Sequence, residues 1–137
     1  MIGIVSENLN FLEKYNVDGD NTCVFFDGYI PPLLIPNVCK FSKSSIFEFE
    51  GEVVSTCLES TKTILRTSMA SKKIYLVEDP EWTNYNRFDY KDLADIFLFS
   101  DVKIVALNKK VYGVLKNMFR EPDLLMEDFN LELLEGI

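Results

Sequence analysis

Short apolar runs separated by polar stretches make up the first third of the chain. MIGIVSE (1–7) and TCVFFDGYI (22–30) are apolar runs that predict two buried strands, the second followed by an Asp-Gly turn signal. NLNFLEKY (8–15), between them, has room for about two helical turns. PPLLIPN (31–37) contains three prolines, which predict an edge or a loop, and VCKFSKSSIFEFE (38–50) predicts a further edge strand.

Helical and strand-like patterns alternate after residue 50. Apolar residues at helical spacing predict one long helix over 52–69. Two more helices are predicted from polar N-cap residues, over 89–99 with Asp89 as the cap and over 109–119 with Asn108 as the cap. The remaining apolar runs predict strands over 73–78, 102–107 and 123–129, and a final helical turn over 130–136.

This alternation favours parallel strands joined by crossover helices. We therefore predict the α/β class, as a single Rossmann-like three-layer domain with a mostly parallel sheet over residues 1–137. A chain of 137 residues with 47% hydrophobic residues has the size and composition of one globular domain. It has no apolar stretch of the ~20 residues that span a bilayer and no charged leader, so we expect a cytoplasmic protein without membrane association.

Charge divides the chain into three parts. Residues 1–60 carry nine acids and three lysines, residues 61–120 carry eleven Lys and Arg against seven acids, and residues 121–137 carry six acids and no base. The net charge of −8 disfavours direct DNA binding, because an acidic chain repels a polyanion. The acidic segments 1–60 and 121–137 instead favour a basic protein partner. The basic middle part suits a phosphate, or is simply a set of solvated side chains.

The absence of histidine narrows the chemistry further. A Ser–His or Cys–His nucleophile is excluded within this chain and an ordinary zinc site is disfavoured, so no metal is expected. Cys23, Cys39 and Cys57 form no CxxC pair and are interpreted as reduced residues in the core or at its boundary. The sequence contains no GxGxxG or GxxxxGK[ST] motif, so no cofactor is expected in this chain itself.

Polar residues at the ends of predicted strands are the first candidate site. Asp27, the adjacent pair Glu78 and Asp79, and Asn108 each follow an apolar run. Ligands of open α/β sheets bind at the carboxyl ends of strands, where a carboxylate can accept the proton of a hydroxyl group. Asp before Pro or Gly is also an ordinary turn residue, so both interpretations stay open.

The segment DPEWTNYNRF (79–88) predicts a polar loop rich in aromatic residues. Trp82, Asn84, Tyr85 and Arg87 are of the types that stack on a sugar or a base and hydrogen-bond to it. The alternative is a loop that folds back onto its own sheet.

Two long segments resemble the acceptor-side, N-terminal half of GT-B glycosyltransferases. SSIFEFEGEVVSTCLESTKTILRTSMASKKIYLVED (44–79) is similar to part of that half in phage DNA β-glucosyltransferases, where a glycine leads into a long helix and then a strand ending in aspartate. DLADIFLFSDVKIVALNKKVYGVLKNMF (92–119) is similar to the end of this domain in GT-B enzymes, and PDLLMEDFNLELLEG (122–136) to the linker that follows. The resemblance covers residues 44–137, rests on pattern rather than identity, and implies the same Rossmann-like fold.

The resemblance implies that Asp79 is the catalytic base, after a one-residue gap in the strand, with Glu78 beside it. The family's donor half has no counterpart in the sequence, so the nucleotide sugar would come through a partner, and the chain would be an accessory or split subunit that is inactive alone. One alternative is a non-catalytic phage or mobile-element interaction protein whose acidic segments bind a basic protein. Another is a homodimer that pairs through GYIPPLLIP (28–36).

Overall fold

The computed structural model describes residues 1–7, 10–15, 21–29, 38–83 and 89–137. The chain divides into two compact units, Met1–Lys73 and Ile74–Ile137, and each is described by itself. Within the described residues, no helix has both the length and the apolar character needed to cross a membrane.

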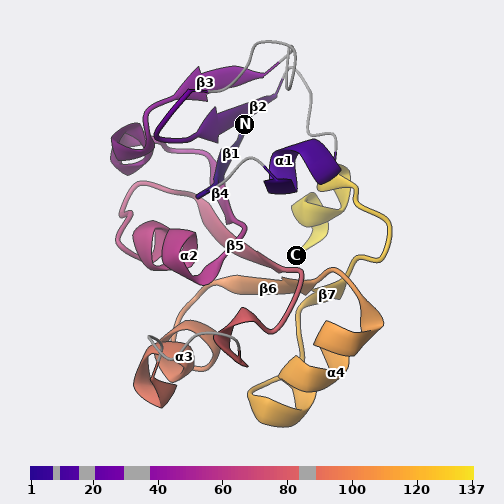
Figure 1. The fold of residues 1–137 in the computed structure, drawn as a ribbon. Helices are drawn as coiled ribbons and strands as arrows, with labels where there is room; N and C mark the ends of the chain where they lie inside the picture. The colour runs from indigo at the N-terminus through magenta and orange to yellow at the C-terminus, as the bar shows by residue number, and fades with distance from the viewer. Residues whose placement is uncertain (8–9, 16–20, 30–37, 84–88) are drawn as a thin grey trace. The chain divides into compact units, whose positions relative to one another are not determined.

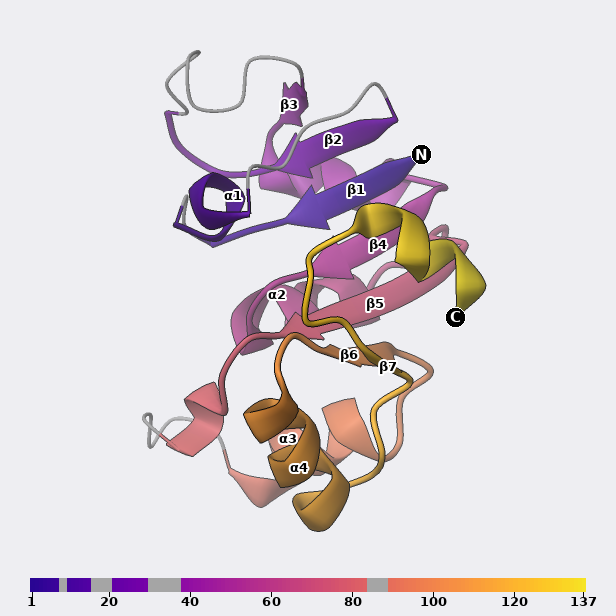
Figure 2. The ribbon, with the colours of Figure 1, turned by 90° about the vertical axis from the view of Figure 1, so that its right-hand side faces the viewer.

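Four described strands form the sheet of the first unit. They are β1 (Ile2–Val5), β2 (Thr22–Phe25), β3 (Cys39–Phe41) and β4 (Glu52–Ser55). Their order is β3-β2-β1-β4 and their pairings are parallel, and Figure 2 shows β1, β2 and β4 running in one direction. The two predicted N-terminal strands are confirmed. Of the edge strand predicted over 38–50 only Cys39–Phe41 is a strand, and residues 43–48 form a 3-10 helix instead. Residues 31–37 lie outside the described part of the chain.

Helices cover both faces of this first sheet. Figure 1 shows α1 (Asn10–Lys14) on one face and the short 3-10 helix η1 (Lys43–Glu48) with α2 (Leu58–Leu65) on the other. The core between the sheet and the η1/α2 side consists of buried apolar residues from five elements: Val5, Cys23, Phe25, Ile46, Val53 and Ile64. Burial of these side chains, at about 25 cal/mol per Å² of apolar surface, is what holds the layers together.

The long helix predicted over 52–69 is wrong at its N-terminal end. Val53 and Val54 belong to strand β4 and are both fully buried, because consecutive strand residues point to opposite faces and both faces are covered here. The helix begins only at Leu58, after the cap Cys57, and it ends at Leu65 rather than Met69, so the prediction is also wrong at its C-terminal end. Cys57 Sγ accepts from the Ser60 N–H at 3.4 Å, and the Ser60 hydroxyl accepts from the Cys57 N–H at 3.2 Å. This reciprocal cap starts the helix.

The second unit repeats the alternation of strands and helices. Its strands lie in the order β5-β6-β7 with parallel pairing, and Figures 1 and 2 both show α3 and α4 together below β6 and β7. The rings of Phe97, in α3, and Phe119, after α4, stack at a centroid distance of 4.8 Å. The strands predicted over 73–78 and 102–107, both predicted helices and the final helical turn are confirmed, whereas only Leu124–Leu125 of the strand predicted over 123–129 is a strand. The elements are β5 (Lys72–Val77, which begins in the first unit), the 3-10 helix η2 (Glu81–Thr83), α3 (Tyr90–Phe97), β6 (Lys103–Ala106), α4 (Lys109–Met118), β7 (Leu124–Leu125) and the 3-10 helix η3 (Leu131–Gly136).

Arg120, just after α4, joins several parts of the second unit. Its Nε donates to the Phe97 carbonyl at 2.8 Å and its Nη2 to the Val102 carbonyl at 2.9 Å. Its Nη1 pairs with the Asp123 carboxylate at 3.1 Å. That carboxylate also accepts from the Ile104 N–H of β6 at 2.8 Å. One guanidinium therefore connects the end of α3, the approach to β6 and the segment before β7.

The predicted α/β class with a Rossmann-like, parallel sheet is confirmed. In the first unit the chain order reverses beside β1, since β2 and β3 lie on one side of it and β4 on the other. Such a reversal is the topological switch point at which open α/β sheets bind ligands. The prediction of one domain over residues 1–137 stays a prediction.

Candidate functional site

The switch point of the first unit is occupied by hydroxyl groups that bind one another. Ser55 Oγ and Thr61 Oγ1 lie 2.7 Å apart, and the Thr56 hydroxyl donates to the Val5 carbonyl of β1 at 3.5 Å. The N–H groups of Thr56 and Cys57 both donate to the Ser60 hydroxyl at 3.2 Å. These contacts satisfy polar groups at the start of α2 internally, so they serve the fold before any ligand.

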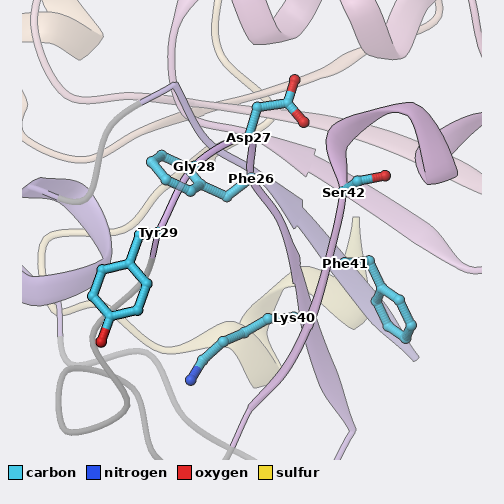
Figure 3. Close-up of a pocket in the computed structure, with 7 residues that line it drawn as sticks. All are labelled: Phe26, Asp27, Gly28, Tyr29, Lys40, Phe41 and Ser42. Carbon is cyan, nitrogen blue, oxygen red and sulfur yellow. The ribbon is translucent and has the colours of Figure 1, made fainter.

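A cavity of about 370 Å³ lies elsewhere in the first unit, at the carboxyl ends of β2 and β3. Figure 3 shows the Tyr29 hydroxyl and the Lys40 ammonium group at one end of it, and the Asp27 carboxylate and the Ser42 hydroxyl at the other. Two segments line it, residues 26–29 and residues 40–42. Aromatic rings beside a carboxylate, an ammonium group and hydroxyls suit a polar ligand with hydroxyl groups.

Asp27 anchors the first unit as well as lining this cavity. Its exposed carboxylate accepts from the Lys43 N–H at 3.0 Å, at the start of η1. The Lys43 ammonium group in turn pairs with Glu7, which follows β1. Gly28 has φ +132°, a conformation that favours glycine, so the predicted Asp-Gly turn is confirmed. Ligand binding by Asp27 stays a prediction.

Asn108 joins the ends of β5 and β6 within the second unit. Its Oδ1 accepts from the Val111 N–H at 2.9 Å, which confirms it as the N-cap of α4. Its Nδ2 donates to the Glu78 carbonyl at 2.8 Å. The structure thus brings two of the predicted site residues together, although through the Glu78 backbone rather than its carboxylate.

Asp79 differs from these residues because its side chain takes no part in a described contact. The side chain is exposed, and among the described residues no hydrogen bond or ion pair reaches its carboxylate. Only its backbone is engaged, since its carbonyl accepts from the Glu81 N–H at 2.9 Å. The Glu81 carboxylate accepts from the Tyr75 hydroxyl at 3.0 Å. After the carboxyl end of β5, the Glu81 carboxylate is therefore engaged, whereas the Asp79 carboxylate is open to solvent.

The interpretation of Trp82 as an exposed stacking residue needs correction. Trp82 is only 7% exposed, and its ring lies edge-on to Phe97 and Phe119 at centroid distances of 5.3 and 5.8 Å. The large apolar ring is buried because η2 folds back onto the second unit, which is the alternative left open for this loop. Asn84, Tyr85 and Arg87 lie outside the described residues.

Sequence reasoning missed the contribution of β3 to the cavity. The Asp-Gly signal located the turn after β2, but Lys40, Phe41 and Ser42 reach the same place only through the pairing of β3 with β2. The alternating apolar residues of 38–50 were the only signal in the sequence for this contribution. They predicted a strand but did not indicate that it pairs with β2.

The described residues contain no group of three or more His, Cys, Asp or Glu side chains arranged to hold a metal ion. In comparisons with known proteins, no family model, no curated protein and no solved structure matches this chain.

Proposed function

We propose that this chain is the acceptor half of a two-component glycosyltransferase of the GT-B type, a cytoplasmic subunit whose partner binds the nucleotide sugar. The observation that carries the proposal is the solvent-exposed Asp79 carboxylate, which directly follows the carboxyl end of β5 and has no side-chain partner among the described residues. A residue needed only to end a strand commonly uses its side chain as a cap, as Asn108 does here.

In the proposed reaction, this chain supplies a proton acceptor for the acceptor hydroxyl group. Asp79 would accept the proton of an acceptor hydroxyl group while that oxygen forms a bond to the anomeric carbon of the sugar donor. The nucleoside diphosphate would leave with the electrons of the broken glycosidic bond. A positioned carboxylate base of this kind contributes about 10²- to 10⁴-fold to the rate. Glu78 lies beside it in sequence, and Asn108 holds the Glu78 carbonyl in place.

The test begins with capture of the partner. The tagged full chain is used to isolate binding proteins from extracts of its native cell, and the isolated pair is assayed for sugar transfer from UDP-glucose and related nucleotide sugars. Asp79→Asn in this pair is expected to lower the transfer rate by about 10²-fold or more, because amide nitrogen and oxygen cannot take up the proton. The melting temperature is expected to stay unchanged, because no described contact is lost.

Asp101→Asn is the matched control. Asp101 is an exposed carboxylate that precedes β6, at the amino end of the strands of the same unit. The Asp101→Asn variant loses the same charge as Asp79→Asn, but at a position away from the proposed site. Its transfer rate is therefore expected to equal that of wild type. Equal rates for Asp79→Asn and Asp101→Asn would remove Asp79 from the mechanism, and a captured pair without transfer activity would overturn the proposal.

The second candidate is a non-catalytic interaction protein that binds a basic partner. The acidic segment 121–137 gives it specific support. Glu121, Asp123 and Glu127 are paired with Lys or Arg of the second unit. Exposed acids without a described ion pair also occur in the segment: Asp128, Glu132 and Glu135.

A triple charge reversal of these three residues to Lys separates the two candidates. The triple variant is expected to bind a basic partner more weakly than wild type. Its binding is also expected to depend less on salt concentration, because salt screens the attraction between exposed charges. Asp79→Asn would leave such binding unchanged. A homodimer through residues 28–36 is a third arrangement, and most of that segment lies outside the described residues.

A further inference from the structure

The register of the first sheet places two cysteines side by side. Cys23 of β2 and Cys39 of β3 are direct partners in the parallel pairing of these strands. Direct partners on neighbouring strands point to the same face of a sheet. The next partners on that face, Phe25 and Phe41, show this directly, because their rings stack at a centroid distance of 5.7 Å.

The distance between neighbouring strands suits a disulfide. Strands of one sheet lie about 4.8 Å apart, and disulfides join Cα atoms separated by roughly 4.4–6.8 Å. Both thiols are free, and Cys23 Sγ donates to the Ile2 carbonyl at 3.7 Å. Formation of the bond would replace this contact of Cys23 with a bond to Cys39.

The two thiols differ in access. Cys39 is exposed on the edge strand, whereas Cys23 is 1% exposed. We infer that Cys23 and Cys39 are a reversible dithiol–disulfide pair, in which Cys39 reacts first with a low-molecular-weight disulfide such as oxidised glutathione and Cys23 closes the bond. Transient disulfides of this kind are the ones found in reducing compartments.

The exchange balances in two steps. The Cys39 thiolate attacks one sulfur of oxidised glutathione, forming a mixed disulfide and releasing one glutathione thiolate. Cys23 then loses its proton to solvent, and its thiolate attacks the Cys39 sulfur and releases the second glutathione. The protein loses two protons and two electrons, which is two hydrogen atoms in all, and these reduce one oxidised glutathione to two glutathione molecules.

The environment of Cys23 determines the rate of the second step. Burial, then the nearby Cys39, raise the pKa of Cys23 to about 11, while the N-terminal amine lowers it. The contribution of Cys39 disappears when that residue is held in a mixed disulfide, so the first step itself makes Cys23 easier to ionise. The second step is still slow, because a buried thiol is a poor nucleophile.

A disulfide between Cys23 and Cys39 would restrain one wall of the cavity at the carboxyl ends of β2 and β3. β3 contributes Lys40, Phe41 and Ser42 to its lining, and a link between β2 and β3 would hold this edge strand in place. Neighbouring strands lie about 4.8 Å apart, which is wider than the mean Cβ–Cβ distance of about 3.8 Å in relaxed disulfides. Some strain therefore remains, and strained disulfides are the readily reduced ones.

The full chain treated with oxidised glutathione provides the test. We expect mass spectrometry to show loss of two hydrogen atoms, non-reducing peptide mapping to join Cys23 to Cys39, and dithiothreitol to reverse both. Cys57→Ser is the control and is expected to oxidise like wild type, whereas Cys39→Ser and Cys39→Ala are expected to form no internal disulfide. Circular dichroism verifies that the variants fold.

Three results would overturn the inference. They are a mixed disulfide at Cys39 that never resolves, an internal bond that includes Cys57, and a chain that stays fully reduced after long incubation. The melting temperature gives an independent readout: the oxidised protein is expected to melt at a higher temperature than the reduced one, because a crosslink restricts the unfolded chain. The Cys39 variants are expected to show no such shift.

Discussion

Replacing Arg120 by methionine tests how the second unit is held together. Methionine keeps much of the apolar stem and removes the guanidinium. The change deletes hydrogen bonds to the carbonyls of Phe97 and Val102, at 2.8 and 2.9 Å, and the ion pair with Asp123 at 3.1 Å. The Asp123 carboxylate keeps its bond from the Ile104 N–H. The loss is therefore confined to the guanidinium and the groups that it joins.

The expected cost is about 2–4 kcal/mol in the free energy of unfolding. Hydrogen bonds that involve a charged group contribute about 1.5–3 kcal/mol each. The Arg120 side chain is 32% exposed, so water screens the ion pair and partly replaces the lost donors, and the full sum of three bonds is not reached. Arg120→Lys keeps the charge but offers no planar fork, so most of the loss is expected to remain.

Trp82 makes the measurement specific to this unit. It is the chain's single tryptophan and packs against Phe97 and Phe119, so its fluorescence reports unfolding of the second unit in urea. Circular dichroism is recorded in parallel, because two compact units need not unfold together. A lower urea midpoint at unchanged slope is the expected signature.

Lys116→Met is the matched control for this experiment. It also removes one cation and leaves methionine, but its pairing with Glu121 is 4.0 Å long and both side chains are more than half exposed. Its effect is expected to stay within about 0.5 kcal/mol. If Arg120→Met were no more destabilising than Lys116→Met, the guanidinium would not hold α3 and β6 together, and the reasoning would be refuted.

Two further changes test the strand ends and the buried thiol. Asn108→Ala is expected to lower the free energy of unfolding by about 1–2 kcal/mol, and Asn108→Asp by less, because aspartate keeps the cap and loses only the donor to the Glu78 carbonyl; equal effects in urea unfolding would contradict this. Burial, then Cys39, raise the pKa of Cys23 from 9.0 to about 11, so the neutral thiol is favoured in the folded protein. Its stabilising effect is therefore complete below pH 9 and is lost as the pH approaches 11, by at most about 3 kcal/mol. Cys23→Val should remove this loss, and identical alkaline unfolding of variant and wild type would count against it.

Local chemistry explains which predictions from sequence were confirmed. Asp89 and Asn108 were predicted as N-caps because a side-chain oxygen reaches an N–H only three residues away, and both contacts are present. The strands β5 and β6 were predicted from continuous apolar runs, which indicate coverage on both faces whatever lies next to them. The parallel Rossmann-like order followed from the alternation of such elements.

Periodicity failed where a strand and a helix present similar apolar spacing. Val53 and Val54 fit a helical stripe with Leu58, and only the pairing of β4 with β1 made them strand residues. Trp82 fits an exposed platform equally well in sequence, and its burial depends on Phe97 and Phe119, which come from later segments. Long-range packing decided both cases.

The candidate sites divide in the same way. The sequence was sufficient to place Asp79 after a strand, because a strand end is a local feature. The cavity and the Cys23–Cys39 pair required the tertiary structure, because both depend on which strand lies beside β2 and in which register. Register is set by the buried faces of all the strands together, so a shift of one residue would turn each side chain to the other face. No local pattern contains that information.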